Sequence, residues 1–216
     1  IWVLVGAAFI IALGYGLIAP VLPQFAGSFG VSMAAAGAVI SIFAFARLIG
    51  APGAGRLVDR LGSRPIYLTG LLIVAASTFF VAFAQAYWQI LALRFIAGFG
   101  STMFTLSAQA LIVRVTHPSI RGRANALYAS AFLVGNVVGP IIGAALSFLG
   151  FRAPFVIYGI AVAGAAVAVG ALTQPKPGSE PLPAAKPKMR VHQAWQSSTY
   201  KALLAAGFPN GFVNMG

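Results

Sequence analysis

Two arginines, Arg47 and Arg94, interrupt long apolar stretches of the sequence and are its strongest candidates for binding chemistry. A charged side chain inside an apolar membrane helix costs at least about 2.5 kcal/mol, so it usually faces a cavity or a partner and marks a transport path. This reasoning places Arg94 in a binding site. Arg47 lies roughly 12 Å from the end of its stretch, and three roles stay open for it: it could reach the membrane surface, pair with an acidic group, or bind an anion.

Polar side chains follow Arg94 at the spacing of one helix face. Residues 101, 105 and 109 are four apart, so in a helix they form a stripe on the same side as Arg94. The stripe predicts a face that lines a pathway, and the alternative is that its hydroxyl and amide groups only hydrogen-bond to neighbouring helices. The predicted pathway residues are Arg94, Arg47, Ser101, Thr105, Gln109, Tyr15 and Asn136.

A further candidate is the charged segment GRLVDRLGSRP, residues 55–65, which lies between two apolar stretches. Its Asp59 is one of only two acidic residues in a chain with 14 basic ones. A carboxylate among guanidinium groups can accept charge-assisted hydrogen bonds, which would hold the segment in one conformation and release it in another. The alternative is that Asp59 only reduces repulsion between arginines. The predicted gating residues are Gly55, Asp59, Arg60, Gly62 and Arg64, with the two glycines allowing a tight reversal.

Composition identifies the class of protein. Hydrophobic residues make up 60% of the sequence, charged residues 7%, and the mean hydropathy is +0.92, values that indicate an integral membrane protein. The net charge of +12 would otherwise suggest nucleic acid, but that partner needs a basic surface on a water-soluble fold, so we exclude it. The sequence has no cysteine and no metal-ligand cluster, phosphate-binding loop or nucleophile set, so it predicts neither an enzyme nor a cofactor or metal.

Apolar stretches of about 20 residues, the length that crosses roughly 30 Å of hydrocarbon, occur six times, and a seventh begins near residue 199. Because only a helix satisfies its own backbone hydrogen bonds in lipid, each stretch predicts a transmembrane helix. The predicted spans are 2–25, 34–55, 66–84, 87–113, 124–149 and 154–172. The chain starts and stops within apolar stretches, so we expect it to be a piece of a longer protein.

The basic residues predict the orientation of these helices. They concentrate in the connections after the second, fourth and sixth spans, whereas the opposite connections carry only Arg152. The positive-inside rule therefore predicts that these three connections and the N-terminus are cytoplasmic, in the plasma (inner) membrane. We predict three parts: a six-helix unit at 1–172, a proline- and lysine-rich cytoplasmic linker at 173–198, and the start of a seventh helix at 199–216.

Small residues on the fifth span predict close helix packing. Gly135, Gly139 and Gly143 are four residues apart and share one face, which lets a neighbouring helix approach closely in lipid. Pro140 predicts a bend beside this face. A smooth face that also bends suits helices that rock against one another.

Together these motifs resemble the major facilitator superfamily, a large group of secondary transporters with two six-helix halves. Residues 55–64 fit its G-x-L-x-D-R-x-G-R-[KR] loop signature, except that Ser63 stands where a basic residue is usual. Arg94 begins a match to its R-x-x-x-G element, and residues 135–144 fit the G-x-x-x-G-P-x-x-G-G element associated with proton-coupled antiporters, with Ala144 replacing the last glycine. The opening GYGLIAPVLP is similar to the first helix of drug:proton antiporters.

This resemblance implies an all-α integral membrane fold: an N-terminal six-helix bundle of two inverted three-helix repeats, one half of a twelve-helix transporter. It implies proton-coupled efflux of small lipophilic, drug-like molecules by alternating access, driven by an ion gradient. The partners implied are the substrate, the lipid bilayer and a C-terminal six-helix half. Since no acidic residue lies within a predicted span, a titrating carboxylate would come from that second half.

Two other functions stay open at this point. Arg47 and Arg94, with no acidic residue inside the spans, would also suit a transporter of an anionic metabolite. The same fold could instead serve as a membrane sensor or scaffold that transports nothing.

Overall fold

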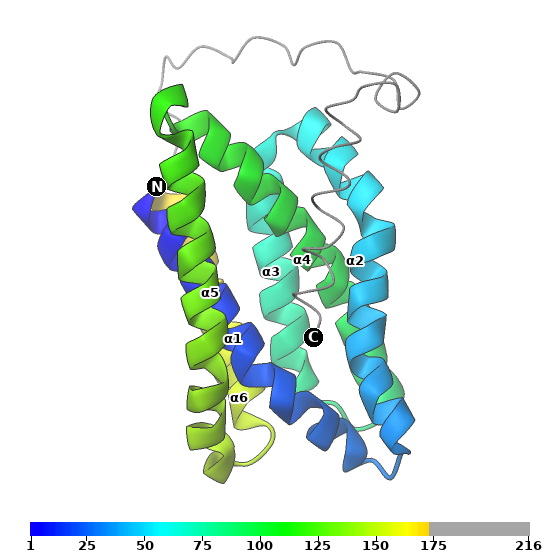
Figure 1. Cartoon of the computed structure of the whole chain (residues 1–216). Helices are drawn as coiled ribbons and strands as arrows, with labels where there is room; N and C mark the ends of the chain where they lie inside the picture. The colour runs from blue at the N-terminus through cyan, green and yellow to red at the C-terminus, as the bar shows by residue number, and fades with distance from the viewer. Residues whose placement is uncertain (173–216) are drawn as a thin grey trace, which may run out of the picture. The chain divides into compact units, whose positions relative to one another are not determined.

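The structure, a computed structural model, describes residues 1–172, except for the side chain of Ser147. These residues form six long helices and two short 3₁₀ turns, Pro118–Ile120 and Ser147–Leu149, and contain no strand (Figure 1). The predicted linker and the start of the seventh helix lie outside the described residues. The long helices are α1 (Trp2–Gly27), α2 (Met33–Leu61), α3 (Ser63–Val81), α4 (Tyr87–Val115), α5 (Arg121–Leu146) and α6 (Ala153–Leu172).

All six helices are long and apolar enough to cross a membrane, with a mean hydropathy of 1.5 to 2.3 over their most apolar windows. This confirms the all-α membrane fold with six spans. Several helices extend past the predicted span at one end, as α2 does to Leu61, because a helix that leaves the hydrocarbon can continue with polar residues whose side chains reach water.

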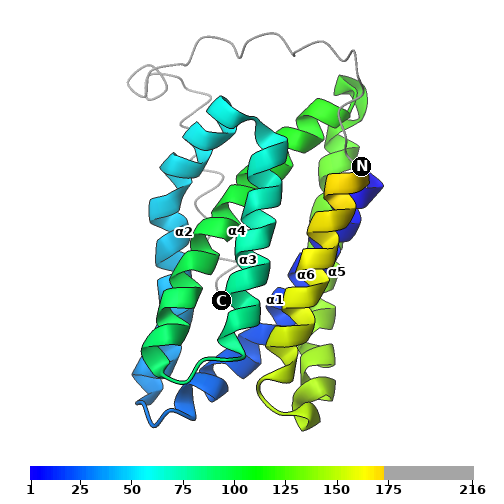
Figure 2. The same cartoon turned by 180° about the vertical axis from the view of Figure 1, so that it is seen from behind.

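The pairs of helices that pack together reveal an internal repeat (Figures 1 and 2). The helix α1 packs on α5, and correspondingly α4 packs on α2. The helix α1 also packs on α6, and correspondingly α4 packs on α3. The fifth pair is α3 with α6. If α1 trades places with α4, α2 with α5 and α3 with α6, the α1–α5 pair becomes the α4–α2 pair and the α1–α6 pair becomes the α4–α3 pair. The α3–α6 pair stays the same. The bundle therefore consists of two three-helix units with matching contacts.

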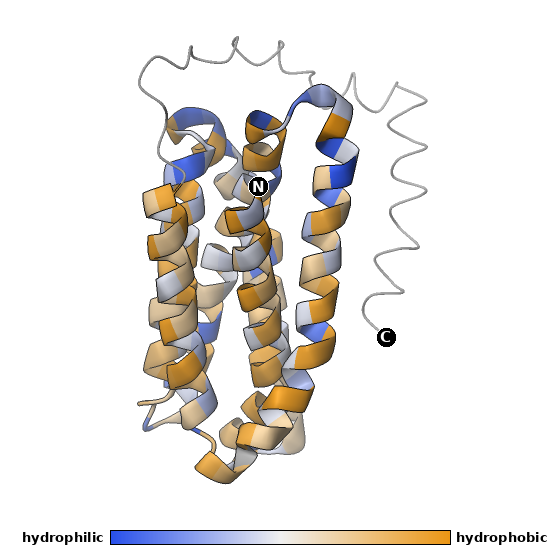
Figure 3. Ribbon diagram, turned by 90° about the vertical axis from the view of Figure 1, so that its left-hand side faces the viewer, coloured by the Kyte–Doolittle hydropathy of each residue, from blue (hydrophilic) through white to orange (hydrophobic). Residues whose placement is uncertain are grey.

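The polar residues gather at one end of the bundle, where Figure 3 shows hydrophilic colours on the helix ends. This end holds the α2–α3 turn and the α4–α5 connection, and the N-terminus of α1 lies toward it (Figure 1). We call it the basic end, because the last turns of α2 and α4 and the first turns of α3 and α5 carry its arginines. They are Arg56, Arg60, Arg64, Arg114, Arg121 and Arg123.

The chain reversal inside the charged segment occurs at Gly62 alone. Gly62 has φ +89°, a backbone conformation that favours glycine, and it separates α2 from α3. Gly55 lies inside α2, and a Cβ added to it would meet nothing within 4 Å. The expectation that Gly55 shapes a loop was therefore wrong, because residues 56–61 continue the hydrogen-bonded helix into the predicted loop.

The small-residue face of α5 lies directly against α1. A Cβ added to Gly135 would come within 2.7 Å of the Phe9 carbonyl oxygen, and one added to Gly139 would clash with the Leu13 carbonyl. A Cβ added to Gly143 would lie 2.8 Å from the Leu17 carbonyl oxygen. The two backbones meet at distances that no larger side chain allows, so this face fixes how closely α1 approaches α5.

Candidate functional site

Arg94 lies on α4 inside the bundle, with only 5% of its surface exposed. Its guanidinium donates a hydrogen bond of 3.1 Å to the hydroxyl of Thr78 on α3. Its Cζ lies 5.6 Å from the centre of the Phe43 ring on α2, within the range of a cation–π contact. The Nε atom has no hydrogen-bond partner among residues 1–172. Arg94 is thus a buried cation held by a hydroxyl and a ring, with donor capacity left over.

A glycine one turn along α4 explains how α2 reaches this arginine. A Cβ added to Gly98 would lie 2.6 Å from both the Phe43 carbonyl oxygen and the Ala46 Cβ. The absence of a side chain at Gly98 lets α2 cross α4 in direct contact, and this crossing places the Phe43 ring beside Arg94. The R-x-x-x-G spacing therefore has a local structural reason.

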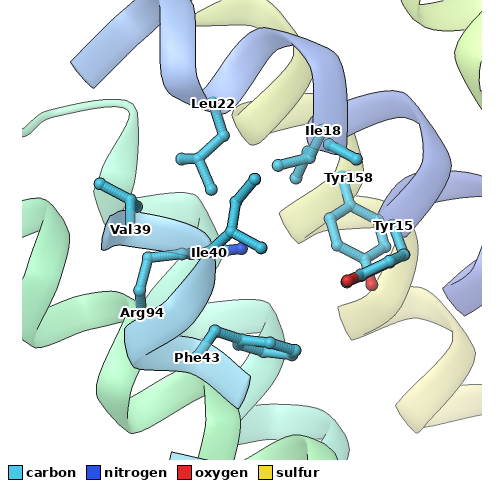
Figure 4. A pocket seen from close by; sticks show the side chains of 9 residues that line it. Tyr15, Ile18, Leu22, Val39, Ile40, Phe43, Arg94 and Tyr158 are labelled. Atoms are coloured by element: carbon cyan, nitrogen blue, oxygen red, sulfur yellow. The ribbon is translucent and has the colours of Figure 1, made fainter. Parts of the chain in front are cut away.

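A small cavity of about 40 Å³ lies beside Arg94 (Figure 4). Figure 4 shows Arg94 and Phe43 across the cavity from Tyr15 and Tyr158. The volume accommodates a few water molecules and is far below the roughly 300 Å³ at which pockets for drug-sized ligands begin. The lining residues come from α1, α2, α4 and α6: Tyr15, Ile18, Ala19, Leu22, Val39, Ile40, Phe43, Arg94 and Tyr158.

Two tyrosines form the wall of the cavity that faces Arg94. Tyr158 of α6 is buried, and its hydroxyl donates a hydrogen bond of 3.1 Å to the Ile11 carbonyl oxygen of α1. Its ring occupies the space that a side chain at Gly14 would take. Tyr15 is 41% exposed, and its ring centre lies 6.0 Å from that of Phe43. The wall combines aromatic surface with two hydroxyl groups.

The second arginine predicted for the pathway approaches the same ring. Arg47 is exposed, and its Cζ lies 6.0 Å from the centre of the Phe43 ring. Phe43 is therefore contacted by both arginines, one buried and one exposed. The structure brings Arg47, Arg94 and Tyr15 close to the Phe43 ring, and of these three Arg94 and Tyr15 line the cavity.

The rest of the predicted pathway residues lie elsewhere, and none of them lines the cavity. The Thr105 hydroxyl donates to the Ser101 carbonyl oxygen of its own helix at 2.7 Å. The Asn136 amide donates to the Phe132 carbonyl oxygen, also within its own helix, at 3.1 Å. Gln109 is exposed. The polar stripe is thus one face of α4, but only Arg94 of that stripe reaches the cavity.

Sequence reasoning missed Thr78 and Tyr158, the residues that hold Arg94 and form the far wall of the cavity. Both are single polar groups in apolar helices, α3 and α6, with no spacing pattern that links them to Arg94. Thr102 was also missed: its hydroxyl lies 3.2 Å from the Arg47 carbonyl oxygen and 3.1 Å from that of Gly98, and so bridges α4 to α2.

The charged segment lies at the basic end, away from the cavity. Arg64, in the first turn of α3, donates a hydrogen bond of 2.6 Å to the Gly170 carbonyl oxygen near the end of α6. A cation at a helix C-terminus is favourable, because the last carbonyl groups lack partners within the helix. Asp59 and Arg60 are exposed in the last turn of α2. Within residues 1–172 no group of three or more metal-binding side chains occurs.

A sequence profile of the Major Facilitator Superfamily matches residues 4–216 of the chain. The chain is 34% identical over 180 residues to "Multidrug resistance protein MdtG" of Enterobacter lignolyticus (strain SCF1), which covers 81% of this chain and 43% of that protein. It is 31% identical over 173 residues to "Multidrug resistance protein 1" of Bacillus subtilis (strain 168), covering 80% of this chain and 44% of that protein.

"Quinolone resistance protein NorA" of Staphylococcus aureus (strain MRSA252) is 32% identical over 160 residues, covering 74% of this chain and 41% of that protein. The chain therefore spans less than half of the length of each of these relatives.

Proposed function

Because this chain belongs to the major facilitator superfamily, we propose that it forms the N-terminal half of a secondary active transporter that exports small lipophilic molecules in exchange for protons. The observation that carries the proposal is the similarity of this chain, at 31 to 34% identity over 74 to 81% of its length, to three proteins named for drug resistance. Alternating access would come from rocking of this half against the C-terminal half.

The chemistry of the cavity supports a lipophilic substrate. Its walls are aliphatic and aromatic side chains with a few polar groups, the composition typical of small-molecule sites. Its small volume supports a site that the two halves complete together. Tyr15 and Arg47, both partly or fully exposed beside Phe43, are the residues of this half that we propose to contact substrate across that interface.

Proton coupling needs a group that titrates, and residues 1–172 contain a single acidic residue, Asp59, at the basic end. We therefore propose that the titrating carboxylate belongs to the C-terminal half, where its charge would be balanced by Arg94. The positive-inside rule supports a cytoplasmic location for the basic end and for the N-terminus, in the inner membrane. Asp59 with its neighbouring arginines would then act as a cytoplasmic latch.

A second candidate is the transport of an anionic metabolite. One reason is that the Nε of Arg94 has no hydrogen-bond partner among residues 1–172 and can still donate. The other is that a second arginine, Arg47, lies beside the same Phe43 ring as Arg94. Guanidinium groups bind carboxylate and phosphate through paired hydrogen bonds.

The two candidates differ in a measurement on the full-length protein. Everted membrane vesicles are energised, and proton release is recorded as ethidium or an organic anion is added. We expect release with ethidium that is lost in Arg94→Ala and kept in Arg152→Ala, a matched change at an arginine outside the cavity. A response to anions only would favour the second candidate. No flux of either kind, with both variants inserted normally, would contradict transport and favour a scaffold.

A further inference from the structure

The two tyrosines that line the cavity at Arg94 differ in how they are held. Tyr15 of α1 is 41% exposed, whereas Tyr158 of α6 is 6% exposed. Figure 4 shows both of them across the cavity from Arg94. Tyr15 therefore reaches the surface of the bundle, and Tyr158 bounds the cavity from within it.

The side chain of Tyr158 is seated on the backbone of α1. A Cβ added to Gly14 would overlap the Cδ2 and Cε2 atoms of the Tyr158 ring, so the ring needs a glycine at this position. The Tyr158 hydroxyl donates a hydrogen bond of 3.1 Å to the Ile11 carbonyl oxygen. Ile11 and Gly14 are three residues apart and share one face of α1. The ring and the hydroxyl are thus both fixed on the same face of that helix.

The helix α1 cannot move away from Tyr158, because α5 occupies its other side. Gly16 follows Gly14 by two positions and lies about 200° around the helix from it. A Cβ added to Gly16 would lie 2.9 Å from both the Asn136 carbonyl oxygen and the Pro140 Cδ of α5. Since α1 is packed between α6 at Gly14 and α5 at Gly16, Tyr158 forms a rigid wall.

This wall limits the cavity on the side of α6. The cavity measures about 40 Å³, and the Tyr158 ring that lines it also fills the space over Gly14. A smaller side chain at position 158 would add that space to the cavity. A side chain at position 14 would instead displace the ring, which adjoins the cavity. Two changes on different helices therefore alter the size of the cavity in opposite directions.

We propose that Tyr158 determines the size of the lipophilic molecule that this site accepts, by closing the cavity at Arg94 on its α6 side. This inference rests on the proposed function and gives the bundle a part in selectivity that is separate from the contacts of Tyr15 and Arg47. The ring limits the bound molecule by its volume, and the hydroxyl acts by holding the ring in place. A single methylene group changes binding in an apolar pocket by about 10- to 200-fold, so a whole ring suffices for a clear size preference.

The test compares two lipophilic cations of equal charge, methyltriphenylphosphonium and tetraphenylphosphonium, in which one methyl group is replaced by a phenyl ring. Their dissociation constants are measured by equilibrium dialysis against the detergent-solubilised full-length protein. Tyr158→Leu should shift the ratio of the two constants toward the larger cation by at least about 10-fold. Gly14→Ala should shift it toward the smaller cation. Tyr158→Phe keeps the ring on Gly14 and should stay near the wild-type ratio.

Tyr128→Leu and Gly6→Ala are the matched controls. Tyr128 is a buried tyrosine of α5 outside the cavity, and a Cβ added to Gly6 of α1 meets nothing within 4 Å. Neither control should shift the ratio, and a shift in Tyr128→Leu equal to that in Tyr158→Leu would show that loosened packing sets it instead. The double variant Gly14→Ala/Tyr158→Leu should return toward the wild-type ratio, because the alanine methyl group takes up part of the space that the ring leaves. If Tyr158→Leu alone does not fold, Gly14→Ala and the double variant decide the question.

Initial efflux rates of both cations, from cells that express the full-length protein, separate this inference from the proposed function. Shifted binding ratios without any efflux would support the role of Tyr158 and contradict transport. Efflux with ratios that neither Tyr158→Leu nor Gly14→Ala changes would overturn the role of Tyr158 and leave transport standing. Neither binding nor efflux of the two cations would overturn both.

Discussion

The guanidinium of Arg94 on α4 and the hydroxyl of Thr78 on α3 are joined by a hydrogen bond of 3.1 Å inside the bundle. This bond fixes one end of the guanidinium, while the Phe43 ring lies beside it at 5.6 Å. The arginine therefore keeps one orientation toward the cavity instead of reaching for the membrane surface. Its position follows from α2 and α3 as much as from α4.

The change Thr78→Val removes this acceptor while keeping the shape of the side chain. Leaving a charged donor buried without its partner costs at least about 1–3 kcal/mol, so we expect a lower melting temperature and a slower initial efflux of ethidium from cells that express the full-length protein. Thr78→Ser retains the hydroxyl and should stay close to wild type. Equal behaviour of the valine and serine variants would show that the hydrogen bond does not position Arg94.

The change Gly139→Ala should separate α1 from α5. The added Cβ would clash with the Leu13 carbonyl, and overpacking of this kind typically costs about 1–3 kcal/mol. Gly164→Ala is the matched control on α6, since a Cβ there meets nothing within 4 Å and alanine is the better helix former. Thermal melting of the two variants should move in opposite directions, and a stable Gly139→Ala protein would argue against close α1–α5 packing.

Gly62 and Gly55 should respond differently to alanine, although both belong to the same sequence motif. Gly62 has φ +89°, where an alanine costs about 1–3 kcal/mol of backbone strain. Gly55 lies inside α2 with open space around it, so alanine there should be neutral or slightly stabilising. Urea unfolding of the detergent-solubilised protein measures both effects, and equal losses at the two positions would contradict the helix boundary at Leu61.

Arg64 should stabilise the end of α6. Arg64→Gln shortens the side chain and removes the charge that lies at the Gly170 carbonyl, so the last turn of α6 should open more often. Hydrogen–deuterium exchange of peptides that cover this turn should accelerate, while the start of α6 stays unchanged. Arg56→Gln, an equivalent change on the exposed end of α2, should leave α6 exchange at the wild-type rate.

Asp59 is the key residue of the proposed cytoplasmic latch. Asp59→Asn keeps the shape and removes the charge, so charge-assisted hydrogen bonds to arginines weaken and the balance between inward and outward conformations should shift. Single cysteines placed on either side of the membrane, in a full-length protein without other cysteines, report this balance by their labelling rates; the 216 residues of this chain contribute no cysteine of their own. Unchanged labelling together with unchanged efflux would rule out the latch.

The sequence alone determined the membrane class, the six spans and the approximate helix limits, because lipid forces each apolar stretch of sufficient length to form a helix. It also singled out Arg94, since a charge in an apolar helix needs a compensating environment. It pointed to the small-residue face of α5, since glycines four residues apart share one side of a helix. These inferences depend on local periodicity and composition, which can be read from one chain.

Only the tertiary structure decided what surrounds Arg94. Thr78, Phe43 and Tyr158 come from three different helices, and each is an isolated residue without a spacing pattern that connects it to Arg94. The polar stripe of α4 was a correct helix face, yet only its arginine reaches the cavity. Helix crossing sets which residues of different helices meet. It depends on close backbone contacts, such as the contact of Gly98 on α4 with Phe43 and Ala46 on α2, and sequence periodicity within a single helix does not encode such contacts.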